Sequence, residues 1–282
     1  MTVTPGVVGG STPTRVRVRY DAIERRHVLA GVVSVVDSAV LTVAHRDPAG
    51  AYVAAFREAL AARGIVVDGT AAPARIAKSI PAAEPGASDT LVTVLSPTLR
   101  EVLPHFEKPS QNQIGELLLK TMGLERAGVG SADSGRRVVE RQLQSWGIAA
   151  ERDVVVRDGS GLSRHDYVSP RALIRVLDAM RRDTSFRTFY DALPVAGVDG
   201  TIASRMKGTP AAGNVHAKTG TLDKARALSG YVTTADGELL LFSVLCNNYT
   251  VPTREVDRVA DAVAARLASL RLGASPAAGG AR

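Results

Sequence analysis

The 282-residue sequence contains little cysteine, few aromatic residues and no long apolar run. Its single cysteine, Cys246, excludes an intrachain disulfide. Because it lies within the apolar run 239–246, we expect it to be a small buried side chain rather than a nucleophile. Aromatic residues make up only 4% of the chain, so valine, leucine, isoleucine and alanine have to fill the core. No apolar stretch is long enough to predict a membrane span.

Two further absences concern targeting and partners. Residues 1–10 lack a basic segment followed by an apolar one, so no secretory signal is predicted there. The 35 lysines and arginines outnumber the 28 acidic residues, which raises the alternative of a nucleic-acid-binding protein. The arginines are scattered, however, and no clustered basic helix, zinc-ligand spacing or interleaved aromatics accompany them. We therefore expect no nucleic-acid partner.

Hydrophobic patterns predict the secondary structure most clearly in the last third of the chain. Residues 218–222, 228–233 and 238–246 are expected to form three strands, and Ala235-Asp236-Gly237 is a turn signal between the second pair. An amphipathic helix is predicted over residues 254–270.

The tripeptide Lys218-Thr219-Gly220 is the most informative motif. A Lys-Thr-Gly that enters a strand is a landmark of serine acyl-enzymes that act on D-Ala-D-Ala peptides and β-lactams. A substrate bound along a strand edge needs a backbone donor for its oxyanion, a hydroxyl for its carboxylate and a nearby positive charge. A strand with a lone lysine is the alternative interpretation. The position before two more strands and a terminal helix favours the functional one.

A second landmark of these enzymes, Ser-x-Asn, matches Ser110-Gln111-Asn112. In the functional interpretation Ser110 relays protons towards the leaving amine, and the Asn112 amide binds the substrate backbone. In the alternative interpretation Ser110 only caps the following helix, which we expect to end at Gly123. The order of the motifs along the chain, with this one upstream of Lys-Thr-Gly, favours function.

Two glycine-containing segments, 158–164 and 199–201, are interpreted from their residues alone as turns, since glycine supplies positive φ. Neither contains a nucleophile and base at a spacing that predicts catalysis.

Taken together, these stretches resemble the D-alanyl-D-alanine carboxypeptidase/endopeptidase family of peptidase S13, the penicillin-binding-protein-4-like group. The resembling segments are 108–112 with 116–120, 158–164, 198–201, 207–210 and 217–222. The resemblance implies hydrolysis of D-Ala-D-Ala or of D-Ala–diaminopimelate cross-links in peptidoglycan through an acyl-serine intermediate. It implies no metal and no cofactor, peptidoglycan stem peptides and β-lactams as partners, and an extracytoplasmic location.

The resemblance also assigns site residues by motif. It implies that Ser110, Asn112 and Lys218 are catalytic, and that Thr219 and Gly220 bind substrate, with Lys218 and Thr219 forming the element that holds the substrate carboxylate. The backbone N–H of Thr221 would donate to the oxyanion.

The fold implied by the resemblance is α/β of the serine β-lactamase/transpeptidase type, an antiparallel sheet flanked by helices with a helical subdomain that carries Ser110. The active cleft is expected between the sheet and that subdomain. Residues 1–45 would be the end of an inserted β-rich domain, and residues 46–272 the C-terminal part of the transpeptidase-like domain. Residues 273–282 are expected to be a disordered tail.

One family element is not matched. Members carry the nucleophile in a Ser-x-x-Lys near their N-terminus, whereas the only such match here is Ser204–Lys207, downstream and in an irregular stretch. We interpret that match as chance, and expect the chain to be the C-terminal part of such a protein, with an incomplete sheet and no nucleophile. Two hypotheses stay open: a family enzyme that is active when the upstream segment is present, and a non-catalytic remnant that binds peptidoglycan peptide or β-lactam weakly. The sequence leaves the oligomeric state and the balance between carboxypeptidase and endopeptidase action undetermined.

Overall fold

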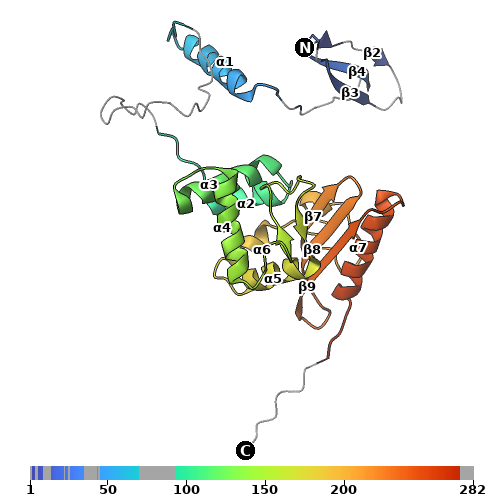
Figure 1. Cartoon of the computed structure of the whole chain (residues 1–282). Coiled ribbons are helices and arrows are strands. Elements are labelled where there is room, and N and C mark those ends of the chain that lie inside the picture. Colours follow the sequence, from blue (N-terminus) through green and yellow to red (C-terminus); the bar gives the residue numbers. More distant parts are fainter. Residues whose placement is uncertain are drawn as a thin grey trace, which may run out of the picture. The chain divides into compact units, whose positions relative to one another are not determined.

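The computed structural model describes residues 2–3, 6–8, 14–21, 23–24, 26–34, 43, 45–69 and 93–273. The chain forms two compact units, Met1–Thr93 and Val94–Arg282 (Figure 1). The domain boundary expected at residue 45 therefore falls within the first unit. Residues 274–282 of the expected tail lie outside the described residues.

Within its described residues, the first unit contains one sheet and one helix. The sheet comprises β1 (Thr2–Val3), β2 (Gly6–Val8), β3 (Arg15–Asp21) and β4 (Arg26–Ser34). Strands β1 and β2 pair with β4 in parallel, and β3 pairs with β4 antiparallel. The alternation of Arg and Val along β3 exposes its arginines and half-buries its valines. Helix α1 (Pro48–Ala61) is capped by Asp47, whose Oδ1 accepts a hydrogen bond from Gly50 N at 2.9 Å.

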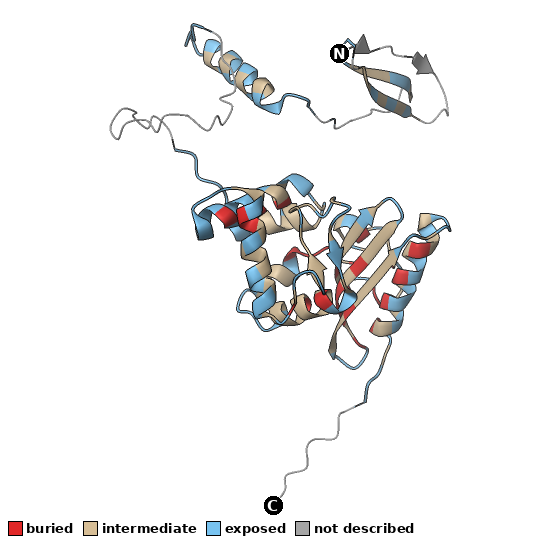
Figure 2. Ribbon diagram, viewed as in Figure 1, coloured by how far each residue is buried: buried red, intermediate tan, exposed pale blue. Residues whose placement is uncertain are grey.

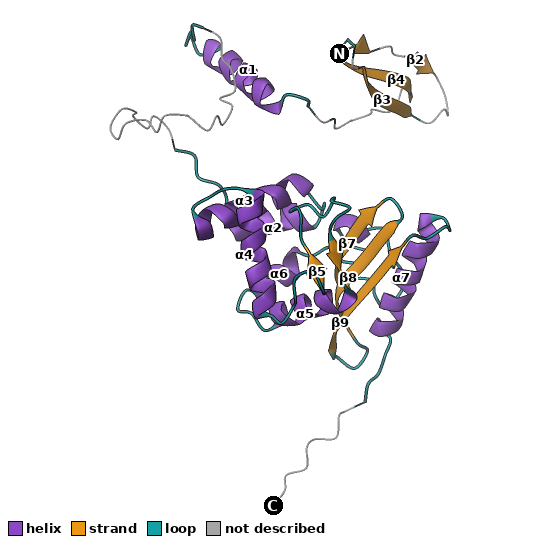
Figure 3. Cartoon of the chain, in the orientation of Figure 1, coloured by secondary structure: helices purple, strands orange, loops and turns teal. Residues whose placement is uncertain are grey.

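The second unit is built on the three C-terminal strands that the sequence predicts. Strands β7 (His216–Leu222), β8 (Ala225–Thr233) and β9 (Leu239–Asn247) form an antiparallel sheet in the order β7-β8-β9. Helix α7 (Thr253–Ala268) covers one face and a group of helices lies on the other, so the α/β prediction is confirmed (Figures 1 and 3).

The helical layer precedes the sheet in the chain. Its helices are α2 (Leu99–Glu107), α3 (Asn112–Ala127), α4 (Ala132–Ser145), α5 (Pro170–Arg181) and α6 (Phe186–Ala192), and a 3₁₀ turn η1 (Gly200–Ile202) follows. A small hairpin of β5 (Val154–Val155) and β6 (Tyr167–Val168) lies between α4 and α5 in the sequence.

Apolar contacts on both faces hold the sheet between these layers. The buried residues of α7 recur every four positions and pack with the Ala217 and Leu228 side of the sheet (Figure 2). On the other face Tyr231 is fully buried among the aromatic side chains of α6, and its hydroxyl donates to Leu177 O at 2.7 Å. One tyrosine thus joins the middle strand to α5 as well as to α6.

Two expectations are corrected here. Helix α3 does not end at Gly123 but continues to Ala127, and Gly128 in the left-handed region follows it. Gly123 serves packing instead, because a Cβ there would lie 2.7 Å from Gly135 N on α4. Cys246, on β9, is only half-buried.

Among the described strands, β9 pairs with β8 alone. In that same part of the chain, none of the helices has the length and apolar character needed to span a bilayer.

Candidate active site

Ser110 and Lys218 meet although 108 residues separate them. Lys218 Nζ donates to Ser110 Oγ at 2.7 Å and to Thr219 O at 2.9 Å. Ser110 lies in the loop between α2 and α3 with a φ of 58°. The alternative interpretation, in which Ser110 only caps α3, is wrong: the cap is Gln111, whose side chain accepts from Gln113 N. The serine hydroxyl therefore faces the lysine rather than the helix.

The environment of Lys218 suits proton transfer. Burial lowers the pKa of Lys218, and the neighbouring Glu107 carboxylate partly opposes this shift. Burial also raises the pKa of Glu107. A lysine with a depressed pKa gives up its proton more readily than a solvated one. Its hydrogen bond to a serine hydroxyl makes the pair able to relay a proton.

An ion pair fixes the loop that carries Ser110. Lys108 Nζ lies 2.6 Å from Asp199 Oδ2 and donates to Leu193 O at 3.1 Å. The other carboxylate oxygen of Asp199 accepts from Val195 N at 2.9 Å. The Lys108 side chain therefore joins the start of segment 108–112 to both ends of segment 193–199.

The backbone of residues 199–201 touches that of Lys108. Thr201 N donates to Lys108 O at 3.0 Å. Gly200 has a φ of 61°, and a Cβ there would lie 2.9 Å from Lys108 O, so only glycine fits between them. The segment 199–201, predicted as a simple turn, is thus a brace for the Ser110 loop.

Among the described residues, only the first part of the outer edge of β7 is covered by another segment. Ala217 N donates to Pro194 O and Ala196 N donates to Val215 O, both at 2.9 Å, so segment 194–196 covers the start of the strand. In an antiparallel pair the backbone groups of alternate residues point to the same side. Because the register with β8 is continuous, the N–H and C=O groups of Thr219 and Thr221 also point to this outer edge.

A pair of hydroxyls lies beside this edge. Thr201 Oγ1 and Thr219 Oγ1 are 2.7 Å apart, and Thr201 is exposed. The motif analysis identified Thr219 as a site residue, but it gave no role to Thr201, which lies in the resembling segment 198–201 and was interpreted as part of a turn.

The remaining motif residues, Asn112, Ser204 and Lys207, are exposed. Asn112 is the first residue of α3 and is exposed, and within the described residues no hydrogen bond joins its amide to Ser110 or Lys218. Ser204 and Lys207 are both exposed in a turn, and no hydrogen bond in the described part of the chain connects them. The geometry of that Ser-x-x-Lys is not that of an activated nucleophile.

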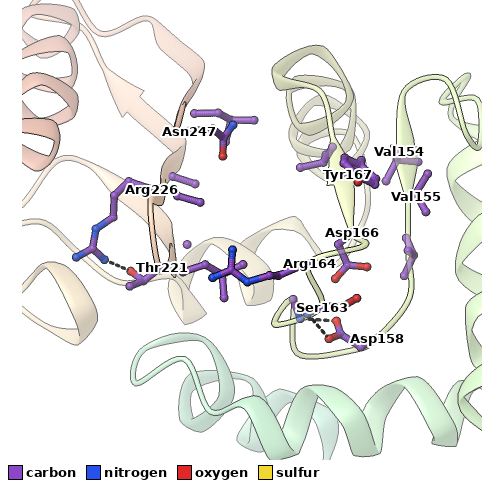
Figure 4. A pocket seen from close by; sticks show the side chains of 18 of the residues that line it. Val154, Val155, Asp158, Ser163, Arg164, Asp166, Tyr167, Thr221, Arg226 and Asn247 are labelled. Atoms are coloured by element: carbon purple, nitrogen blue, oxygen red, sulfur yellow. Dashed lines mark hydrogen bonds between the residues drawn. The ribbon is translucent and has the colours of Figure 1, made fainter. Parts of the chain in front are cut away.

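A pocket of about 770 Å³ lies at the C-terminal end of β7 (Figure 4). One wall is formed by the ends of the three strands, where Thr221, Arg226 and Asn247 line it. The facing wall comprises β5, β6 and the loop between them, and Arg164 of this loop points across towards Thr221 (Figure 4).

The loop 158–164 is not the simple surface turn predicted from its glycines. Its base sits on α3, where Glu116 Oε1 accepts from Gly159 N and Ser160 N, both at 3.1 Å, and from Ser160 Oγ at 2.7 Å. A Cβ on Gly115 would lie 2.4 Å from Gly159 O, so helix and loop backbones touch. Glycine is required here for close approach rather than for a turn alone.

The carboxyl groups of Asp158 and Asp166 both lie in the connection between β5 and β6. Burial, together with the hydrogen bond and charge of Asp158, raises the pKa of Asp166 to about 6, while the hydrogen bond from Arg157 N opposes the shift. Burial acts on Asp158 as well, but hydrogen bonds from Asp166, Gly161 N and Ser163 N outweigh it and leave the pKa of Asp158 lowered. One proton held between the two carboxyls accounts for both shifts.

No group of three or more His, Cys, Asp or Glu side chains that would suit a metal ion occurs among the described residues.

Comparisons with known proteins agree on one family. A family model described as D-Ala-D-Ala carboxypeptidase 3 (S13) matches residues 9–270. A D-alanyl-D-alanine carboxypeptidase of an Actinomadura species is 39% identical over 218 residues, which cover 76% of this chain and 39% of the relative. The D-alanyl-D-alanine carboxypeptidase DacB of Haemophilus influenzae is 34% identical over 170 residues, covering 59% of this chain and 35% of the relative. The chain thus spans well under half of the length of either curated relative.

Among solved structures, penicillin binding protein 4 (dacB) of Haemophilus influenzae, complexed with a β-lactam, is similar with a TM-score of 0.71. The sequence identity is 25%, and the match covers 91% of this chain and 60% of that one.

The ion pair between Lys108 and Asp199 is expected to stabilise the second unit. Asp199→Ala removes the partner of a half-buried ammonium and the acceptor of Val195 N, so we expect a loss of about 1–3 kcal/mol in the free energy of unfolding. Urea unfolding followed by the fluorescence of Trp146, the only tryptophan, measures it for the second unit. The control is Asp191→Ala, which breaks the exposed Arg187–Asp191 pair and should cost under about 0.5 kcal/mol. Equal losses of stability in the two variants would refute this stabilising role of the Lys108–Asp199 ion pair.

The carboxyl pair predicts a pH effect of defined sign. Because the folded state raises the pKa of Asp166 from 3.8 to about 6, it binds the proton more tightly than the unfolded state does, and this contribution to stability is lost as pH rises through that range. Asp166→Asn stays neutral and its amide still donates to Asp158. The free energy of unfolding of this variant should therefore increase relative to that of the wild type as pH rises from 4 to 7. The increase should be on the order of 1 kcal/mol, because the site is partly solvated.

The matched control is Asp183→Asn. The hydrogen bond from Ser185 lowers the pKa of Asp183, so this variant should instead lose stability relative to the wild type as pH rises. The same sign in both variants would contradict the assignment of the shared proton.

Proposed function

We propose a function from one premise: the chain belongs to the D-Ala-D-Ala carboxypeptidase 3 (S13) family. Its role is to provide the substrate-binding side of a serine-type D-Ala-D-Ala carboxypeptidase or endopeptidase, which acts on peptidoglycan peptides through an acyl-serine intermediate. The observation that carries this proposal is the 2.7 Å hydrogen bond between Lys218 and Ser110, which unites two motifs far apart in the sequence. We propose a site of action outside the cytoplasm, as the family membership implies.

Each site residue has a role in this proposal. The Ser110–Lys218 pair passes a proton to the leaving amine, for which the lowered pKa of Lys218 is suited. The charge of Lys218 and the hydroxyl of Thr219 hold the terminal carboxylate of the substrate. Thr221 N–H, on the open edge of β7, donates to the developing oxyanion, and Gly220 lets the substrate approach the strand.

Asn112 has room at the mouth of the site to bind the substrate backbone, since its amide is exposed at the start of α3. Peptides and β-lactams that carry a carboxylate next to the scissile amide fit this arrangement. No cofactor is needed for acyl transfer by a serine, so none is included in the proposal.

The acyl-accepting serine is not assigned to this sequence. Ser204–Lys207 is exposed and unpaired in the described part of the chain, and Ser110 bonds to the lysine of the substrate-binding strand rather than to one in its own helix. We infer that this chain by itself binds D-Ala-D-Ala peptides without being acylated. A non-catalytic protein that binds such peptides or β-lactams weakly is the second candidate, favoured by the same observation.

Binding tests the proposal directly. The purified chain should bind an acetylated tripeptide ending in D-Ala-D-Ala, and Lys218→Ala should weaken binding at least about 10-fold, because a hydrogen-bonded charge is lost from the carboxylate site. Titration calorimetry gives both dissociation constants. Lys207→Ala, which removes an exposed lysine from a turn, should leave the affinity unchanged. Equal affinities of the wild type and Lys218→Ala would refute the proposed site.

Acylation tests the missing nucleophile. After incubation with benzylpenicillin, intact-protein mass spectrometry should find only the mass of the free chain, since no activated serine is assigned. A stable mass increase of one penicillin would overturn this inference. Repeating the measurement on Ser110→Ala and Ser204→Ala would then identify the serine responsible.

A further inference from the structure

We propose that Thr201 is a second carboxylate-binding hydroxyl of the substrate site, beside Thr219. This inference rests on the proposed function and extends it to a residue that lies outside the Ser-x-Asn and Lys-Thr-Gly motifs. The ligand group is the terminal carboxylate of a D-amino-acid peptide.

Thr201 is positioned between the two parts of the site. Its N–H donates to Lys108 O, two residues before Ser110, and its hydroxyl lies 2.7 Å from that of Thr219, the residue after Lys218. The Ser110 loop therefore fixes its backbone, while its side chain lies against the strand. Both anchors exist without substrate, so the hydroxyl needs little reorganisation to bind.

The hydrogen bonding of Thr201 differs from that of threonines that serve the fold. Thr121 Oγ1 and Thr209 Oγ1 each donate to a nearby backbone carbonyl, which uses their only proton. The hydroxyls of Thr201 and Thr219 contact each other instead. One hydrogen bond between two hydroxyls uses one of their two protons and leaves the other free to donate.

A carboxylate can accept a hydrogen bond from the proton that the Thr201–Thr219 hydroxyl pair leaves free to donate. Its two oxygens accept several hydrogen bonds, so each hydroxyl can turn its proton from the neighbouring threonine to one carboxylate oxygen. The ammonium group of Lys218, on the adjacent residue of β7, supplies positive charge beside the same edge. A C-terminal amide carries no charge and offers one acceptor, so it fits the pair less well.

The test compares an acid with an amide. The acetylated tripeptide ending in D-Ala-D-Ala and its C-terminal amide are titrated into the wild type, Thr201→Val and Thr201→Ser. We expect Thr201→Val to weaken binding of the acid roughly 10-fold and to leave binding of the amide unchanged. Thr201→Ser should restore most of the loss. Thr121→Val, which removes a hydroxyl from an exposed position of α3, should change neither affinity.

Each other outcome is decisive. An unchanged affinity for the acid in Thr201→Val refutes the inference and leaves the proposed function standing. Equal weakening of acid and amide also refutes it, since the hydroxyl would then act on the loop rather than on the carboxylate. If the wild type binds neither ligand, the proposed function fails and this inference fails with it. Trp146 fluorescence during urea unfolding confirms that each variant folds before it is titrated.

Discussion

The contact between Lys218 and Ser110 exists only while the helical layer holds a loop against the edge of the sheet. A half-buried ammonium group requires polar partners, because its removal from water is costly. Ser110 Oγ and Thr219 O supply them. The layer is held in two places, at the Lys108–Asp199 ion pair and at Tyr231, whose hydroxyl joins the middle strand to α5.

Close backbone contact is the second means by which this unit positions its loops. Gly115 meets Gly159, Gly123 meets Gly135, and Gly200 meets Lys108, each at a distance that leaves no room for a Cβ. A backbone in contact with another backbone moves less than one separated by flexible side chains. The loops that carry the polar groups of the site are therefore seated on α3 and on each other, which suits a site that has to present donors without rearranging.

The edge of β7 combines these features. Segment 194–196 covers its first residues, and the open part presents the backbone groups of Thr219 and Thr221 next to Lys218 and the two threonine hydroxyls. An extended peptide can pair with such an edge while its terminal carboxylate reaches the hydroxyls. The pocket beside Thr221, with Arg164 and the two carboxyls on its far wall, lies where this open edge ends.

Local patterns in the sequence were enough to predict the three C-terminal strands, the last helix and the two principal motifs, because strand alternation, helical periodicity and short motifs are local properties. The sequence alone did not determine that Gln111 caps α3, that Gly123 lies within a helix, or that residues 199–201 brace the Ser110 loop. Ser110 is drawn away from the cap by Lys218, Gly123 packs against Gly135 of the next helix, and residues 199–201 contact Lys108, so each feature depends on which segments folding brings together. The pairing of Thr201 with Thr219 and the opposite pKa shifts of Asp158 and Asp166 were likewise decided only by the tertiary structure, since hydrogen bonds and pKa shifts depend on which groups folding brings together and removes from water.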